Sequence, residues 1–133
     1  MKSVYISYAN EDLQTAKELQ SILQNAGVTA IVVEHTTFNP NGDVAADMLQ
    51  QIKTAETMVC IFSKFTNDSN FVSIELNAAV KREKKVFILN TDRTEIDKKN
   101  NFVLANSVTL TNRELNKAAQ ELLPLLAKGG SHA

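Results

Sequence analysis

The chain has 133 residues, of which 44% are hydrophobic, so it has the size of one ordinary domain and can bury a single core. Lysine and arginine number 14 against 15 acidic residues, and the net charge of -1 offers no basic surface to nucleic acid or to an anionic membrane. No apolar run has membrane-spanning length and the N-terminus has no signal sequence, so we expect a cytoplasmic protein.

The first third of the sequence predicts a strand, a helix and a second strand. Val4–Tyr8 is a short strand-like run, and polar residues that suit a helix start follow it. Gly27 then provides a left-handed helix end, and Val28–Val33 has the composition of a strand buried on both faces. Between them, apolar residues at spacings of three and four predict one buried helix face, made by Leu13, Ala16, Leu19, Leu23 and Ala26.

The middle of the sequence begins with a long loop, residues 34–43, that contains Pro40 and an Asn-Gly turn. Asp43 can cap the helix that we expect over residues 44–55. The run TMVCIF, residues 57–62, predicts a third strand, in which the single cysteine, Cys60, reads as a buried and inert thiol.

The second half predicts a third helix between two further strands. Its cap is expected at Asn67, Asp68 or Ser69, and the basic residues over 81–85 at its end are typical of a solvated face. Val86–Asn90 predicts the fourth strand.

The C-terminal part predicts a fifth strand, Ser107–Thr111, and a last helix from Asn112 or Arg113 to Leu126, kinked or shortened by Pro124. We expect one domain over residues 1–128. Residues 129–133, GGSHA, are expected to be a flexible tail with the composition of a cloning remnant.

Strands and helices alternate along the chain, which predicts an α/β fold with an open, mostly parallel sheet and helices on both faces. In such sheets, ligands bind outside the carboxyl ends of the strands. That rule selects four segments: residues 7–10, 34–42, 63–69 and 90–93.

Several common sites are excluded by composition. The only glycines are at 27, 42, 129 and 130, which rules out a Walker loop and a GxGxxG turn. His35 and His132 are too isolated for a metal site or a Ser-His-Asp triad. We therefore expect no metal and no phosphate loop.

A phosphorylation receiver domain would share this architecture. Glu11 and Asp12 could supply its acidic residues after the first strand. It also needs an aspartate directly after the third strand, where this chain has Ser63 and Lys64 and reaches an aspartate only at Asp68. The receiver reading is rejected.

Glu75 stands between Ile74 and Leu76 in a segment that otherwise reads as a buried helix. A carboxylate leaves water at a cost of several kcal/mol unless it is paired, so this position calls for an explanation. One explanation is structural: Glu75 would pair at the surface with Lys64, Lys81 or Arg82.

The other explanation comes from a family resemblance. VYISYANED, from Val4 to Asp12, resembles the first strand of Toll/interleukin-1 receptor (TIR) domains, and the loop over 34–43 resembles their BB loop. The chain departs from the family in having Phe71 where a tryptophan is usual. The similarity spans Val4 to Asp92, and its most specific part is a spaced pattern after the third strand, formed by Ser63, Phe65, Ser69, Phe71, Glu75 and Leu76.

The resemblance implies a flavodoxin-like, five-stranded sheet in the order 2-1-3-4-5, and two alternative functions. Some TIR domains cleave the nicotinamide-ribose bond of NAD as glycohydrolases or ADP-ribosyl cyclases, and Glu75 matches their required glutamate. Others are scaffolds that act by TIR-TIR assembly. NAD would be the substrate, with no cofactor, in a setting such as bacterial immune signalling. A deoxyribosyltransferase of similar winding, which also uses a glutamate, is a third possibility.

The chemistry gives Glu75 a role in NAD cleavage. Nicotinamide leaves as a neutral base, so no general acid is needed, and one carboxylate can bind the ribose hydroxyls and stabilise positive charge at the anomeric carbon. Phe71 would lie one helical turn before it. Candidate pocket residues, chosen because they fall at or near strand ends, are Ser7, Tyr8, Asn10, Phe38, Ser63 and Phe71.

The family resemblance also implies assembly. We expect a homo-oligomer in which the loop over residues 34–43 of one copy helps to complete the pocket of its neighbour. Phe38 beside Pro40 suits a contact better than it suits water, although Phe38 could equally fold back onto its own core.

Overall fold

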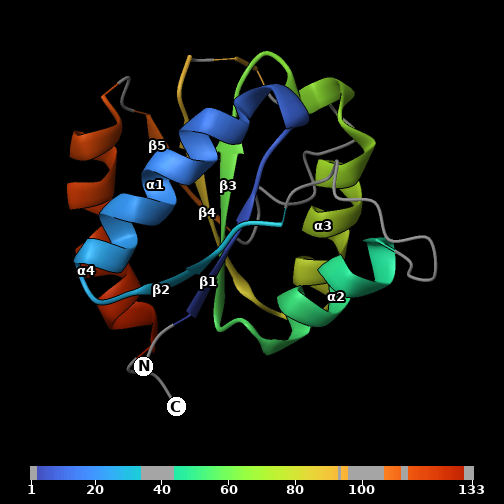
Figure 1. Cartoon of the computed structure of the whole chain (residues 1–133), viewed down its shortest axis with the longest axis horizontal. Coiled ribbons are helices and arrows are strands. Elements are labelled where there is room, and N and C mark those ends of the chain that lie inside the picture. The colour runs from blue at the N-terminus through green and yellow to red at the C-terminus, as the bar shows by residue number, and fades with distance from the viewer. Residues whose placement is uncertain (1–2, 34–43, 93, 96–106, 112–113, 131–133) are drawn as a thin grey trace.

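The computed structural model describes residues 3–33, 44–92, 94–95, 107–111 and 114–130, which form an open sheet with helices on both sides (Figure 1). The loop over residues 34–43, with Phe38, lies outside the described residues. The strands are β1 (Ser3–Ser7), β2 (Thr29–Ile31), β3 (Thr57–Phe62), β4 (Lys85–Asn90) and β5 (Ser107–Thr111). The helices are α1 (Leu13–Asn25), α2 (Val44–Thr54), α3 (Asn70–Lys81) and α4 (Leu115–Gly130).

The five strands are parallel and lie in the order β2-β1-β3-β4-β5, which confirms the predicted fold class and winding. The direction of winding changes between β1 and β3, because β2 lies on one side of β1 and the later strands lie on the other. The register between these central strands pairs Tyr5 with Met58 and Ser7 with Cys60. This junction is where the rule for parallel sheets places a ligand.

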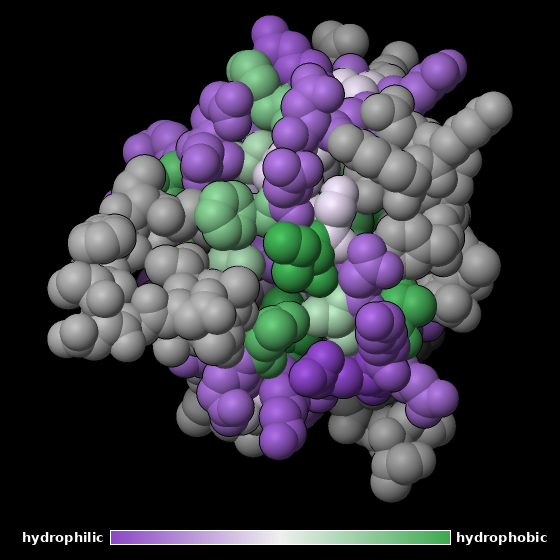
Figure 2. Space-filling view, turned by 90° about the vertical axis from the view of Figure 1, so that its right-hand side faces the viewer, coloured by the Kyte–Doolittle hydropathy of each residue, from purple (hydrophilic) through white to green (hydrophobic). Residues whose placement is uncertain are grey.

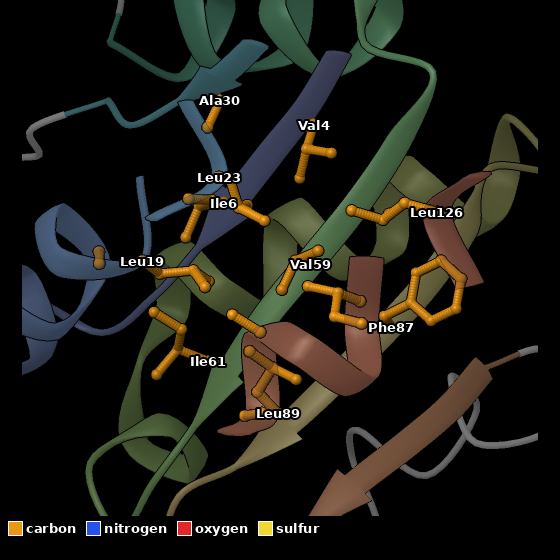
Figure 3. Packing of buried hydrophobic residues seen from close by; sticks show 14 of the residues in the cluster. Val4, Ile6, Leu19, Leu23, Ala30, Val59, Ile61, Phe87, Leu89 and Leu126 are labelled. Carbon is orange, nitrogen blue, oxygen red and sulfur yellow. The ribbon is translucent and has the colours of Figure 1, made fainter. Parts of the chain in front are cut away.

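Each face of the sheet has its own hydrophobic cluster. In Figure 1, α1 and α4 cover one face, and α2 and α3 cover the other. The α1/α4 cluster includes Val4 and Ile6 of β1, and Figure 3 shows its side chains filling the space between the helices and the sheet. The α2/α3 cluster includes Tyr5 of β1 together with Met58 and Cys60 of β3. Alternate residues of one strand therefore belong to different clusters.

The prediction for the second strand is wrong in its length and burial. Val28–Val33 was expected to be buried on both faces, but β2 covers three residues, of which Thr29 is exposed and Ile31 half-buried. β2 is an edge strand with β1 on one side only, so less of its surface is covered by the sheet and helices.

The last helix is longer than predicted. α4 contains Pro124 and ends at Gly130, four residues past the expected helix end at Leu126 and at the second residue of the predicted tail. Its inward side chains, Ala118, Ala119, Leu122 and Leu126, belong to the α1/α4 cluster. In the described part of the chain, no helix is both long and apolar enough to cross a membrane.

Helix α1 ends as its sequence predicted. Gly27 has a φ of 87°, and its N–H donates to the carbonyl of Gln24 at 3.0 Å, while the Val28 N–H donates to Leu23 at 2.9 Å. This is a Schellman end, whose left-handed position glycine occupies without strain.

Helix α3 begins at a predicted cap, since the Ser69 Oγ accepts from the N–H of Val72. Its C-terminus repeats the Schellman pattern with Glu83 in the left-handed position, at a φ of 57°. A residue with a Cβ pays a conformational cost there that glycine does not.

The two helix ends give a matched test of backbone strain. Gly27→Ala should lower the free energy of unfolding by about 1 kcal/mol, because a Cβ at this position meets no atom within 4 Å and only the backbone conformation is penalised. Glu83→Gly should raise it by roughly 0.5–1 kcal/mol for the converse reason. Urea denaturation of both variants measures the effect, and shifts of the same sign would contradict this account.

Candidate active site

Glu75 occupies an inward position of α3. The buried residues of this helix are Val72, Glu75, Leu76, Ala78 and Ala79, which form one stripe against the sheet. Ile74, next to Glu75, is 44% exposed, whereas Glu75 is 0% exposed. Helix geometry therefore puts the charged residue in the core and the apolar one outside.

Two hydroxyl groups of β1 bind the buried carboxylate. The Tyr5 hydroxyl donates a short hydrogen bond to Oε2 of Glu75, and the Ser7 Oγ donates to Oε1 at 2.9 Å. Tyr5 and Ser7 are two residues apart and so lie on the same face of the strand. Each carboxylate oxygen thus has its own donor, and both donors are themselves buried.

These contacts place Glu75 at the junction of β1 and β3. Ser7 is the last residue of β1 and pairs in register with Cys60 of β3. The charge of Glu75 contributes to the raised pKa of Cys60. The carboxylate therefore lies toward the carboxyl ends of the two central strands, at the reversal of strand order.

Burial changes the ionisation of this group. Loss of hydration raises the pKa of Glu75 from 4.5 to about 7, and the hydrogen bonds from Tyr5 and Ser7 limit the rise because they stabilise the ionised form. Burial also raises the pKa of Tyr5 and of Cys60 above their ordinary values, with the Glu75 charge adding to both shifts. Near neutral pH, Glu75 titrates while both neighbours stay neutral.

The structural alternative for Glu75 is not what the structure shows. A surface ion pair with Lys64, Lys81 or Arg82 would need an accessible carboxylate, and Glu75 is fully covered. Within the described part of the chain, its hydrogen bonds come from neutral hydroxyls.

Two of the predicted pocket residues lie on the Glu75 side of the sheet. Ser7 bonds the carboxylate directly, and Phe71 is half-buried one helical turn before Glu75 on α3. Tyr5 was missed by the sequence reasoning. The sequence pattern could have identified Tyr5, because side chains alternate along β1 and this places Tyr5 on the same face as Ser7.

Tyr8 and Asn10 are placed elsewhere. Tyr8 belongs to the α1/α4 cluster on the opposite face of the sheet, and its hydroxyl donates to the carbonyl of Val33 at 2.7 Å. Asn10 is exposed at the start of a short 3-10 helix, Asn10–Asp12. Among the described residues, the hydrogen bonds to the Glu75 carboxylate are donated by Tyr5 and Ser7.

Ser63 takes part in a second polar group at the carboxyl edge. Its Oγ donates to Oδ2 of Asp12 at 2.5 Å and accepts from the Phe65 N–H at 3.2 Å. Burial raises the pKa of Asp12, and the hydrogen bond from Ser63 opposes that rise. Thr66, fully buried, accepts from the Ser63 N–H and so fixes the turn after β3.

The side chains of the described residues include no group of three or more histidine, cysteine, aspartate and glutamate that could hold a metal ion. What the site around Glu75 offers is one carboxylate in a dry environment with two hydroxyl donors. Such a group can stabilise a nearby positive charge or take up a proton.

A family model described as "TIR domain" matches residues 4–123 of the chain. A search of curated proteins finds no match to the sequence. The family match extends well past Asp92, where the resemblance read from the sequence ended.

Solved structures of similar fold include two enzymes and a receptor domain. The CMP N-glycosidase BcmB of Clostridium botulinum superposes with a TM-score of 0.72 at 15% identity, over 93% of this chain and 99% of that one. A 2-deoxyribosyltransferase of Bacillus psychrosaccharolyticus has a TM-score of 0.70 at 18% identity, over 93% and 95%. The TIR domain of the Toll-related receptor TRR-2 of Hydra magnipapillata has a TM-score of 0.68 at 17% identity, over 94% and 91%.

The raised pKa of Glu75 predicts a pH-dependent cost to stability. Well below pH 4.5 the group is protonated in both folded and unfolded states, so its contribution to stability does not change with pH. As the pH rises to about 7, the unfolded chain gains the ionised form first, so the folded state is progressively disfavoured. Glu75→Gln, which stays neutral, should therefore be more stable than the parent above pH 7, by up to about 3 kcal/mol.

Urea denaturation from pH 4.5 to 8 measures this difference. The gap between Glu75→Gln and the parent should open with rising pH, and Glu18→Gln, a change at an exposed position of α1, should show no such trend. A gap that is constant over this range would mean that Glu75 titrates normally.

Proposed function

The chain belongs to the TIR domain family, and from that premise we propose that it cleaves the nicotinamide-ribose bond of NAD, as a glycohydrolase or an ADP-ribosyl cyclase, with Glu75 as the catalytic carboxylate. The observation that carries this proposal is the complete burial of Glu75 without a cationic partner among the described residues, at the junction of β1 and β3. A carboxylate held in this way suits the stabilisation of charge that develops during a reaction.

The chemistry of NAD matches what this site contains. Breaking the nicotinamide-ribose bond moves positive charge from the pyridinium ring to the anomeric carbon of the ribose, and the bonding electrons leave with neutral nicotinamide. A carboxylate near the anomeric carbon stabilises that charge, and more strongly in a dry site than in water. Water or an internal nucleophile of the ADP-ribose part then adds to the same carbon.

Glu75 keeps hydrogen-bonding capacity for a substrate. A carboxylate can accept about four hydrogen bonds, and Tyr5 and Ser7 supply one to each oxygen. The remaining lone pairs suit the two ribose hydroxyls of NAD. Phe71, half-buried one helical turn before Glu75 on the same helix, is the candidate for packing on the nicotinamide or ribose.

A second candidate is cleavage of the N-glycosidic bond of another nucleotide or nucleoside. The fold likeness to a CMP N-glycosidase and to a 2-deoxyribosyltransferase supports this alternative. A neutral pyrimidine leaves far more readily when it is protonated, so this reaction needs a general acid. Glu75, with a pKa of about 7, could be that acid, and activity would then fall as the pH rises through 7.

The non-catalytic alternative is a scaffold that acts by TIR-TIR assembly. Figure 2 shows that the face carrying α2 and α3 has a small hydrophobic patch bordered by hydrophilic side chains. Among the described residues, Phe65 and Ile74 are the large hydrophobic side chains that are exposed. Assembly and catalysis are compatible, and we propose both, in a role such as bacterial immune signalling.

Incubation with NAD, with CMP and with a deoxynucleoside tests the proposed substrate. Nicotinamide should be released from NAD with a rate that rises with pH through about 7, because Glu75 must be ionised. Chromatography identifies the product as linear or cyclic ADP-ribose. Glu75→Gln should lower the rate by about 100-fold or more, and the exposed-site variant Glu18→Gln should keep it.

Three results would each contradict part of the proposal. Release of cytosine from CMP that falls with rising pH would favour the second candidate. Full NAD cleavage by Glu75→Gln would remove Glu75 from the chemistry. No cleavage of any of the three substrates at high protein concentration would leave the scaffold.

A dilution series tests the coupling of assembly to catalysis. Glu75 is fully covered in the single chain, so a substrate reaches it only after the covering groups move. If a neighbouring copy helps to open or complete the pocket through residues 34–43, turnover per monomer should rise with protein concentration. Phe38→Ala should weaken that dependence. A flat profile would show that a single chain is sufficient.

A further inference from the structure

We propose that Tyr5 and Ser7 are positioning residues of the active site, which fix the orientation of the Glu75 carboxylate and favour its ionised form inside an apolar cluster. Their effect on Glu75 is independent of the substrate, whereas their catalytic consequence rests on the proposed function. Tyr5 is the principal member of the pair.

The geometry fixes the carboxylate at both oxygens. Tyr5 binds Oε2 and Ser7 binds Oε1, from one strand that lies in the centre of the sheet. Two donors on two oxygens define the plane of the carboxylate as well as its position. Because both donors stand on a buried strand and not on a loop, little motion is available to them.

Among the described residues, the carboxylate has no hydrogen-bond donor besides Tyr5 and Ser7. Cys60 of β3 faces the same cluster with a thiol whose pKa burial raises, so it stays neutral. The same cluster contains apolar residues of the other elements: Ile52 from α2, Ala55 directly after that helix, Val72 and Leu76 from α3, and Val86 and Ile88 from β4. Within the described residues, stabilisation of the negative charge therefore depends on the two hydroxyls of β1.

Tyr5 has features that a merely packed side chain would not need. Its ring fills the α2/α3 cluster, which a phenylalanine ring would fill equally well. Its hydroxyl adds the hydrogen bond to Glu75, and burial together with the nearby carboxylate raises its own pKa well above the ordinary value of 10. Tyr5 therefore remains a donor over the whole pH range in which Glu75 titrates.

Removing the Tyr5 hydroxyl should shift the ionisation of Glu75 to higher pH. Hydrogen bonds to a charged group favour the charged form, so their loss favours the protonated acid. In Tyr5→Phe the midpoint should rise by about one pH unit, a tenfold change in the ionisation constant. Ser7→Ala should shift it in the same direction by a smaller amount, since Tyr5 is the larger of the two contributions.

The experiment follows the Glu75 carboxyl carbon by 13C NMR during a pH titration of the free protein, with Glu75→Gln used to identify the signal. The expected midpoint is about 7 in the parent, higher in Ser7→Ala and higher still in Tyr5→Phe. Tyr8→Phe is the matched control, because it removes a tyrosine hydroxyl that donates to the carbonyl of Val33 and makes no contribution to the pKa of Glu75. Its Glu75 midpoint should equal that of the parent.

The pH profile of NAD cleavage gives the second readout. In Tyr5→Phe, the acid side of the profile should move to higher pH in parallel with the NMR midpoint. The factor by which kcat falls should be about ten times the factor by which KM rises, because the carboxylate loses its orientation.

The two readouts separate this inference from the proposed function. A shifted midpoint without any NAD cleavage would support the positioning pair and overturn the proposed function. An unshifted midpoint in both Tyr5→Phe and Ser7→Ala would overturn the positioning pair, whatever the activity. If Tyr5→Phe does not fold, the shift in Ser7→Ala decides alone.

Discussion

The rest of the site depends on one constraint, the burial of a carboxylate without a counter-ion in the described structure. A cation beside Glu75 would hold it ionised and inert, whereas exposure to water would leave its pKa ordinary. Burial with two hydroxyl donors has an effect that differs from both, since it removes the carboxylate from water and supplies hydrogen bonds but no opposite charge. The pKa of about 7 follows from that balance. The group can therefore exist as an acid or as a base near neutral pH, which an ordinary glutamate cannot.

This arrangement requires the topology of the fold. Glu75 on α3 meets Tyr5 and Ser7 on β1 across about 70 residues of sequence, and it does so because α3 follows β3 and packs back over the centre of a parallel sheet. The reversal of winding between β1 and β3 brings the carboxyl ends of both strands to the place at the sheet edge where ligands bind in such folds. The winding itself therefore brings a glutamate at this point of α3 to the junction of β1 and β3.

Most of the fold could be predicted from the sequence, because the local patterns that mark strands and helix ends are consistent with the order of strands in the sheet. The apolar run of residues 57–62 matches β3, Ser69 caps α3 and Gly27 ends α1, each for a reason that local chemistry supplies. β2 was predicted too long because its composition says nothing about lying at the edge of the sheet. Edge position follows from tertiary arrangement, which no local pattern encodes.

The site was predicted less completely. Glu75 could be identified because a charged residue interrupts an apolar stripe. The partners of Glu75 depend on which face of β1 is covered by α3, and that is determined by contacts between residues far apart in the sequence. The two-residue alternation of β1 would have separated Ser7 and Tyr5 from Tyr8, but selection by strand end alone grouped Ser7 with Tyr8 and omitted Tyr5. The missing information was the face of the sheet on which each side chain of β1 lies. This face decides contact with Glu75 more than the position of the residue along the strand does.

The energetics of Glu75 argue for a function over a structural role. A side chain that stabilises the fold should bring free energy to it at the working pH, and a buried carboxylate with a raised pKa does the reverse once it ionises. A leucine would extend the apolar stripe of α3, and a glutamine would keep hydrogen bonds to both hydroxyls without a charge. A leucine would leave the Tyr5 and Ser7 hydroxyls without this acceptor, whereas a glutamine would remain a neutral partner for both. The only property that glutamate alone provides at this position is a dry, oriented negative charge, and the reactions that need one are those that develop positive charge beside it.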